Sequence, residues 1–365
     1  MIRSALKKTG MLVVVGIVAF AFAAALGGCT NEEEALPEEN VKYEIALVTD
    51  DSLVMDGGHS ETAWNAITEF GGTHGISHKY YKATEQTDAA FIDAIKAAIN
   101  KGAKVVIVDN NAMANAVYKM QKQYPEISFV LLDAAFDDPA SGEELLMKNS
   151  VAADFDSAQA GYLAGYAAVI DGSTELGFIG QNRTADVKAF GVGYVKGAER
   201  AAGELGVAVT MDYNYLNENE DKQDAYKKAI AMYDDGAQVI FAAGSDIQEA
   251  VIEAAEAKDG KVIGSGTDQS AKSDRVITSA VYDIRGALKE ILGGYTDGKF
   301  PGGKVLQYNA RNEGIGLALK NNHLSNLTQD QYDAVYESLA KGEIQLNADR
   351  VESLQHIITV NVTFK

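Results

Sequence analysis

The chain is poor in the residues that cross-link, kink or anchor small folds. Its 365 residues include one cysteine, four prolines and one tryptophan. A single thiol can form no disulfide within the chain, so the fold must be held together by its hydrophobic core. Basic residues are also scarce, because 32 lysines and arginines stand against 52 aspartates and glutamates, for a formal net charge of -20. Nucleic acid and anionic lipid both require basic surface, and we expect neither as a partner.

Motifs of common catalytic and nucleotide-binding sites are missing from the sequence. It has no GxxxxGK[ST] phosphate loop, no HExxH metal motif, no CxxC pair and no GxSxG nucleophile turn. Gly191-Val192-Gly193 lies in a helical stretch and lacks the strand and glycine spacing of a dinucleotide fingerprint. We interpret these glycines as helix-packing positions, and we expect no catalytic residues and no cofactor.

A metal site is also not expected. His74 and His78 are four residues apart, a spacing that would place two ligands on one helix face. Gly71, Gly72 and Gly75 instead favour a loop in this segment, and no cysteine is available to complete a ligand set.

The one cysteine follows a long apolar run near the amino terminus. Three basic residues precede residues 11–25, which are hydrophobic, and Leu26-Gly27-Gly28-Cys29 ends the run. This order is typical of a bacterial lipoprotein signal, in which the thiol is acylated and the chain is cut before Cys29. The alternatives are an uncleaved transmembrane anchor, for which the run is short of the required ~20 residues, and a buried core cysteine. We predict a signal peptide over residues 1–28, a lipid on Cys29 and an extracytoplasmic position at the cell membrane.

Two kinds of segment follow the cysteine. Residues 29–40 are rich in glutamate and poor in apolar residues, which predicts a solvated acidic tether. From residue 41 on, short Val- and Ile-rich runs such as 104–108 and 128–132 alternate with helical patterns such as 87–100 and 186–205. This alternation predicts an α/β fold with doubly wound parallel sheets. The units are too many for one open sheet, so we expect two lobes.

Polar residues follow the predicted strands at their carboxyl ends, where open α/β sheets bind ligands. They are Asp50-Asp51, Asp109-Asn110-Asn111, Asp133, Gln181-Asn182-Arg183, Gly244-Ser245-Asp246 and Gly266-Thr267-Asp268-Gln269. Each one, taken alone, is also a good helix cap. Because both halves of the chain contribute donors and acceptors, we favour a site for a neutral ligand that carries hydroxyls or amides.

Several segments also carry motifs of a known family, in order along the chain. They are Ile45–Asp50, Tyr124–Asp133, Gln159–Tyr166, Asp235–Phe241 and Ile263–Gln269. The chain thereby resembles the basic-membrane-protein family of solute-binding lipoproteins. The resemblance implies a type I periplasmic-binding-protein fold, an ABC permease as partner and, for characterised members, a purine nucleoside as ligand. It also implies one lobe of residues 41–154 with a returning helix at 284–298, and a second lobe of residues 155–283 and 299–365.

The resemblance transfers some ligand-binding positions and changes others. Asp133 matches the aspartate that recognises the base, and Gly244 matches a turn glycine. His59-Ser60 stand in place of a Phe-Asn pair of the family, and Tyr215 and Asn217 lie near the position of a second stacking phenylalanine. Gly266 stands in place of the first aspartate of the DxDQ motif, which leaves only Asp268. Tyr282 stands in place of a lysine. The predicted ligand-binding residues are Asp51, His59, Ser60, Asn110, Asp133, Tyr215, Asn217, Gly244, Asp268 and Tyr282. If His59 stacks on a base, binding should weaken as the pH falls through the usual range of histidine.

The predicted function is therefore that of a membrane-anchored receptor of an ABC importer. Two lobes capture a small polar ligand, for which the resemblance implies a purine nucleoside. One alternative is a signalling lipoprotein of the same fold that binds a different molecule. A surface hydrolase acting on nucleosides is a further alternative, although the sequence shows no general base with a positioned nucleophile.

Overall fold

The computed structural model describes residues 41–50, 54, 57–109, 111–133, 146–346 and 359–364. The predicted signal peptide and tether, Cys29, Asp51 and Asn110 lie outside these residues. Residues Val41–Lys365 form one compact unit. In the described part of the chain, no helix combines the length and the apolar character needed to cross a membrane.

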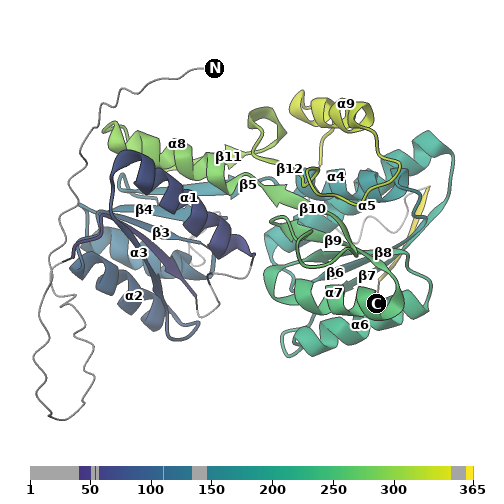
Figure 1. The fold of residues 1–365 in the computed structure, drawn as a ribbon, viewed down its shortest axis with the longest axis horizontal. Helices are drawn as coiled ribbons and strands as arrows, with labels where there is room; N and C mark the ends of the chain where they lie inside the picture. Colours follow the sequence, from purple (N-terminus) through teal and green to yellow (C-terminus); the bar gives the residue numbers. More distant parts are fainter. Residues whose placement is uncertain are drawn as a thin grey trace, which may run out of the picture. The chain divides into compact units, whose positions relative to one another are not determined.

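The first lobe is built on a parallel sheet in the order β11-β5-β4-β3-β1-β2. Its strands are β1 (Ile45–Thr49), β2 (His78–Lys82), β3 (Val105–Val108), β4 (Ser128–Leu132), β5 (Ser150–Phe155) and β11 (Lys304–Tyr308). Leu47 and Ile107 point to one face of the sheet, and their neighbours Val48 and Val106 to the other. Both faces are therefore apolar, and each is covered by helices (Figure 1). The covering helices are α1 (His59–His74) and α8 (Ile284–Thr296) on one face, and α2 (Asp88–Asn100) and α3 (Ala114–Gln123) on the other.

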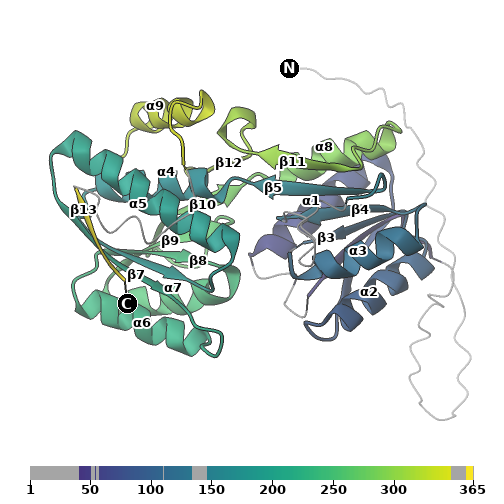
Figure 2. The same ribbon diagram turned by 180° about the vertical axis from the view of Figure 1, so that it is seen from behind.

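The second lobe repeats this plan with the sheet order β12-β10-β9-β8-β6-β7-β13. Its strands are β6 (Glu175–Gly180), β7 (Val209–Tyr215), β8 (Val239–Ala243), β9 (Lys261–Gly266), β10 (Val276–Tyr282), β12 (Ile315–Leu317) and β13 (Val360–Phe364). Only β12 runs antiparallel to its neighbour among the described pairs. Figure 2 shows α4 (Ser157–Ile170) and α5 (Ala185–Leu205) on one face and α6 (Lys222–Asp234) and α7 (Gln248–Lys258) on the other. A last helix, α9 (Gln329–Ala340), packs beside α4.

The boundary between the lobes differs from the predicted division at one strand. Residues 299–365 were assigned to the second lobe, but β11 pairs with β5 in parallel, from Lys304 opposite Val151 to Tyr308 opposite Phe155. β11 therefore extends the first sheet, and the chain returns to the second lobe after Tyr308. The returning helix, predicted at 284–298, is α8, which packs on the first sheet.

The segment around Gly71 is helical, although the sequence analysis interpreted it as a loop. Helix α1 continues to His74 and ends at Gly75, whose φ of 67° suits glycine and whose N–H donates to the carbonyl of Gly71. A Cβ at Gly71 would come nearer than 3.0 Å to the ring of His78. Gly71 therefore serves close packing, and Gly75 serves helix termination. His74 ends the helix while His78 starts β2, so the two imidazoles do not share a helix face.

Helices α4 and α5 pack backbone against backbone through glycines. A Cβ on any of four glycines would lie nearer than 3.0 Å to backbone atoms of the facing helix, a distance that real Cβ atoms essentially never show. The pairs are Gly161 with Phe190, Gly165 with Tyr194, Gly193 with Ala158 and Gly197 with Tyr162. Gly191, in the same stretch, faces the ring of Tyr213. The interpretation of Gly191 and Gly193 as helix-packing positions is confirmed.

Candidate functional site

In the described part of the chain, three segments cross between the lobes. The first leads from β5 to α4, the second from β10 to α8, and the third from β11 through a short 3-10 turn (Ala310–Asn312) to β12. Each crossing contains an aromatic residue followed by an Asp or Asn that caps the next element: Phe155-Asp156, Tyr282-Asp283 and Tyr308-Asn309. The capping oxygens accept backbone N–H groups of Gln159, Gly286 and Arg311 at 3.0, 2.9 and 2.9 Å.

His59 and Ser60 lie at the start of α1, beside the carboxyl end of β3. The hydroxyl of Ser60 donates to Oδ2 of the buried Asp109. Both ring nitrogens of His59 are buried, and neither has a well-formed hydrogen-bond partner among the described residues. Burial lowers the pKa of His59 to about 4, and the Asp109 backbone offsets only part of this effect. His59 is thus neutral near pH 7, with one nitrogen able to donate and the other to accept.

This pKa changes the expected pH range of any ligand effect. The sequence analysis placed protonation of His59 in the usual range of histidine, near 6.5. In the structure the buried ring gains a proton only near pH 4. Protonation at a higher pH requires that the ring become exposed to solvent. A stacking role for His59 itself stays a prediction.

Asp133 follows β4 in the left-handed conformation, with a φ of 53°. Burial raises the pKa of Asp133 well above its usual range, and the charges of Asp186 and Asp154 raise it further. Asp186 stands in the first turn of α5, and burial together with the charge of Asp154 raises the pKa of Asp186 to about 6. Asp133 and Asp154 come from the first lobe and Asp186 from the second. The structure therefore brings carboxyl groups of both lobes close enough to interact electrostatically.

Asp154 and Asp186 are not among the residues predicted from the sequence. Asp186 occupies a helix first turn, where an acidic residue is expected from the helix dipole alone. Asp154 lies within β5 and accepts a hydrogen bond from Nε2 of Gln307 at 2.9 Å. Neither position carried a motif that would have distinguished it from a structural acid.

Tyr282 ends β10 and is enclosed by aromatic rings. Its ring stacks on Phe155, with centroids 4.7 Å apart, and on Phe190 at 5.7 Å. Its hydroxyl shares a hydrogen bond of 2.8 Å with Oγ of Ser157. Burial raises the pKa of Tyr282 well above its usual range, and the charge of Asp133 adds to this effect. Tyr282 thus lies beside the carboxyl groups, but its ring is buried against two other aromatic rings.

Two of the other predicted residues of the second lobe lie next to strands β7 and β8. Tyr215 is buried, its hydroxyl bonds that of Tyr213 at 2.8 Å, and the guanidinium of Arg183 lies 4.5 Å from its ring centroid. Gly244 has a φ of 124°, and its N–H donates to Oγ of Ser265 at 3.1 Å. The conformation of Gly244 explains why glycine is needed there.

The remaining two, Asn217 and Asp268, are exposed and make local contacts. The backbone N–H and side-chain amide of Asn217 donate to Oε2 of Glu220 at 2.7 and 3.0 Å. Oδ1 of Asp268 accepts the N–H of Ser270 at 2.9 Å. Both side chains therefore stabilise turns, and their ligand role stays a prediction.

The neighbours of Asp268 make a contact between the lobes that the sequence did not predict. Oγ1 of Thr267 and Nε2 of Gln269 donate to the carbonyl of Gly57, just before α1, at 3.3 and 3.4 Å. Both side chains are buried. Oε1 of Gln269 is also buried and has no hydrogen-bond partner among the described residues. The β9–β10 loop thus contacts the first lobe through Thr267 and Gln269, on either side of the predicted Asp268.

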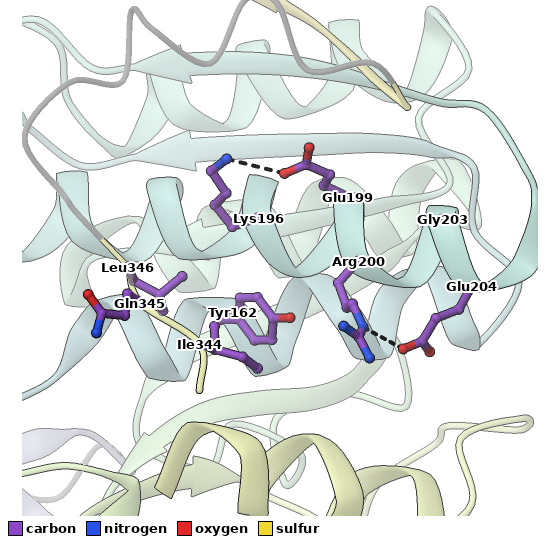
Figure 3. Close-up of a pocket in the computed structure, with 9 residues that line it drawn as sticks. All are labelled: Tyr162, Lys196, Glu199, Arg200, Gly203, Glu204, Ile344, Gln345 and Leu346. Carbon is purple, nitrogen blue, oxygen red and sulfur yellow. Dashed lines mark hydrogen bonds and ion pairs between the residues drawn. The ribbon is translucent and has the colours of Figure 1, made fainter. Parts of the chain in front are cut away.

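A pocket of about 460 Å³ lies elsewhere on the second lobe, between α4, α5 and residues 344–346 (Figure 3). Its charged side chains are paired with one another, Lys196 with Glu199 at 3.2 Å and Arg200 with Glu204. Lys196 is ten residues beyond Asp186 on α5, which is ~15 Å along the helix. This pocket is therefore separate from the strand ends that carry the predicted site.

Two doubly wound parallel-sheet lobes joined by three crossing segments define a type I periplasmic-binding-protein fold. The family model described as "ABC transporter substrate-binding protein PnrA-like" matches residues 43–350, so the chain belongs to this family of solute-binding proteins.

Curated relatives agree with this assignment, and a solved structure shares the fold. The chain is 27% identical over 335 residues to the "ABC transporter nucleoside-binding protein BmpA" of Lactococcus lactis, covering 85% of this chain and 92% of that protein. It is 27% identical over 246 residues to "Basic membrane protein D" of Borreliella burgdorferi, covering 66% and 70%. An ABC transporter solute-binding protein from Conexibacter woesei has the same fold, with a TM-score of 0.68 at 22% identity over 84% of this chain and 99% of that one.

Proposed function

We propose that this protein is the lipid-anchored, extracytoplasmic receptor of an ABC importer, and that it binds a small polar ligand between its lobes without catalysis. The observation that carries the proposal is the meeting of groups from both lobes. Asp133 of the first lobe interacts electrostatically with Asp186 of the second, and Thr267 and Gln269 of the second lobe donate to the carbonyl of Gly57 in the first, although these residues are far apart in sequence. A ligand at this position contacts both lobes, and its differential contacts would bias the hinge toward closure.

The polar groups at this position suit a ligand with paired donors and acceptors. Neutral His59 offers one donor and one acceptor, and neither ring nitrogen has a well-formed hydrogen-bond partner among the described residues. Asp133, with its raised pKa, can accept hydrogen bonds as a carboxylate or donate one as an acid. We propose a nucleoside as the ligand, a class supported by the name of the Lactococcus relative, and specifically a purine nucleoside, as the family resemblance implies.

A thermal-shift screen tests the ligand class. A ligand that binds only the native state stabilises it by about 2.7 kcal/mol at a concentration of 100 times its Kd. We expect inosine or guanosine at millimolar concentration to raise the melting temperature, and ribose and free amino acids to leave it unchanged. A shift with some other small polar molecule, and none with any nucleoside, would replace the nucleoside proposal and leave the receptor proposal in place.

Replacement of Asp133 tests the site itself. Asp133→Asn is the preferred variant, because asparagine tolerates a positive φ whereas alanine would add backbone strain. If a ligand N–H bonds the carboxylate, we expect binding to weaken by about 1.5 to 3 kcal/mol, measured by calorimetry. Asp297→Ala, at the exposed end of α8, is the matched control and should bind as the parent does. Equal affinity of all three proteins would show that Asp133 has only a structural role.

A further inference from the structure

Rings from the three crossing segments stack on one another in a single column. Phe155 stacks on both Tyr282 and Tyr308, with centroid separations of 4.7 and 5.2 Å and interplanar angles of 13 and 28°. The three residues are only 2, 6 and 5% exposed. Each ring comes from a different crossing segment, so the column connects the three crossing segments of the described part of the chain to one another.

The hydroxyls of Tyr308 and Tyr282 bond helices of different lobes, in addition to the stacking contacts of their rings. The hydroxyl of Tyr308 donates to Oε2 of Glu290 on α8 at 3.0 Å, and that of Tyr282 bonds Ser157 on α4 at 2.8 Å. The backbone also links two of the crossing segments, because the N–H of Asp156 donates to the carbonyl of Tyr308 at 2.9 Å. The column therefore runs from a helix of the first lobe to a helix of the second.

Tyr282 has little left to offer a ligand directly. Phe155 and Phe190 both stack on its ring, which is buried, and its hydroxyl shares a hydrogen bond with Ser157. The resemblance to the family had placed a ligand-binding lysine at this position.

We propose that the column formed by Tyr308, Phe155 and Tyr282 is the mechanical element of the hinge, and that Tyr282 is a positioning residue that sets the orientation of the lobes through Phe155. Stacked rings keep favourable contact over centroid separations of roughly 4.5 to 7 Å. They can therefore slide over one another as the lobes rotate, while separation of the rings is opposed. The proposal goes beyond ligand capture and makes no assumption about which ligand is captured.

Distances between spin labels on the two lobes test the proposal in ligand-free protein. Labels on Lys101→Cys, after α2, and Gln223→Cys, in α6, report the separation of the lobes, with Cys29→Ser in the full chain to leave these two thiols alone. Three variants remove one ring from each crossing: Phe155→Leu, Tyr282→Leu and Tyr308→Leu. We expect each to broaden the distance distribution, and the combination of Phe155→Leu with Tyr282→Leu to broaden it by less than the sum of the two effects.

Two controls separate the stack from general loss of packing. Tyr282→Phe keeps the ring and loses only the hydroxyl, so its distribution should match the parent. Phe178→Leu removes a ring that stacks on Tyr213 at 4.3 Å inside the second lobe, away from the crossings, and it should also match the parent. Parent-like distributions for Phe155→Leu and Tyr308→Leu would overturn the proposal. Broadening by Tyr282→Phe equal to that of Tyr282→Leu would also overturn it, since the hydroxyl bond and not the stack would then set the orientation.

A binding arm distinguishes positioning from direct contact. With guanosine as the probe, Tyr282→Phe should keep the parent Kd within about twofold, whereas loss of a ligand hydrogen bond costs about fivefold. Phe155→Leu removes the ring that stacks on Tyr282 and Tyr308. It should change the dissociation rate of guanosine in the same direction as Tyr282→Leu. If guanosine does not bind the parent protein, the nucleoside proposal fails on that result alone. The ligand-free distances still decide the hinge proposal.

Discussion

Two glycine-to-alanine substitutions on one helix should change stability in opposite directions. Gly197 and Gly203 both lie in α5. Alanine has a helix propensity about 1 kcal/mol better than glycine, so without other effects either substitution should stabilise the helix. At Gly203 no atom lies within 4 Å of the new Cβ, and we expect a gain of about 0.5 to 1 kcal/mol.

At Gly197 the same methyl group meets the backbone of α4. Its Cβ would lie nearer than 3.0 Å to the carbonyl oxygen of Tyr162 and the N–H of Tyr166. Backbone atoms cannot move aside as a flexible side chain does, so the helices must separate. Overpacking costs about 1 to 3 kcal/mol, and separation would also weaken the contacts at the three other facing glycines, so the upper end applies. The net expectation for Gly197→Ala is a loss of about 2 kcal/mol.

Thermal unfolding followed by circular dichroism measures both effects. For chains of 150 to 250 residues about 1 kcal/mol corresponds to roughly 2 to 4 °C, and somewhat less for this longer chain. Gly197→Ala should melt several degrees below the parent, and Gly203→Ala slightly above it. If Gly197→Ala were as stable as Gly203→Ala, the close backbone packing of α4 on α5 would be refuted.

Three further predictions concern titrating groups and the anchor. The pKa of His59 is lowered from 6.5 to about 4, so the unfolded chain takes up the proton first and stability should fall by up to about 3 kcal/mol as the pH drops from 6.5 to 4. His59→Gln should flatten this part of the melting-temperature profile, and an unchanged slope would contradict the burial of the ring. The pKa of Asp186 is raised from 3.8 to about 6, so stability should fall as the pH rises through this range, by about 1 to 2 kcal/mol after allowance for partial exposure. Asp186→Asn should therefore melt higher than the parent at pH 7.5, and a lower melting temperature would show that its charge is compensated. Cys29→Ala should abolish incorporation of labelled palmitate, and normal labelling would end the lipoprotein proposal.

The central elements of both lobes could be predicted because their signals are local. The run Ser128–Leu132 was predicted as a strand and is β4, and the helical pattern at 186–205 is α5 within one residue. Both are buried and strongly periodic. The edge strand β2 was missed because its sequence HKYYK is polar and partly exposed, without the apolar run of a central strand.

The assignment of β11 to a lobe could not be predicted from its own residues. Its sequence KVLQY resembles any half-buried edge strand, and nothing in it distinguishes β5 from a strand of the second sheet as partner. The pairing depends on the position of the carboxyl end of α8, which packs on the first lobe and directly precedes β11. That is a property of the topology and not of the segment.

The candidate site shows the same limit at the level of single side chains. The sequence located the turn Gly266–Gln269 at a strand end, which is where it lies. It selected Asp268, but the structure exposes that side chain and buries Thr267 and Gln269, which contact the first lobe. Which residues of a turn point inward depends on the backbone path after Gly266, whose φ is 77°. A motif can therefore place a loop at the site without identifying the residues that contact the other lobe.

The crossing segments combine what the sequence encodes with what only the fold reveals. Each of Phe155-Asp156, Tyr282-Asp283 and Tyr308-Asn309 is a strand end followed by a capping residue, and such a junction can be recognised in the sequence alone. That the three junctions meet, and that their rings stack, follows only from the two-lobed arrangement. On the hinge proposal, Tyr282 makes a contact within the hinge at a position where the family resemblance implies a ligand-binding lysine. Tyr282, the last residue of β10, lies next to the carboxyl groups of the site and is also part of the connection between the lobes. A single substitution at this junction would then change ligand preference and lobe motion together.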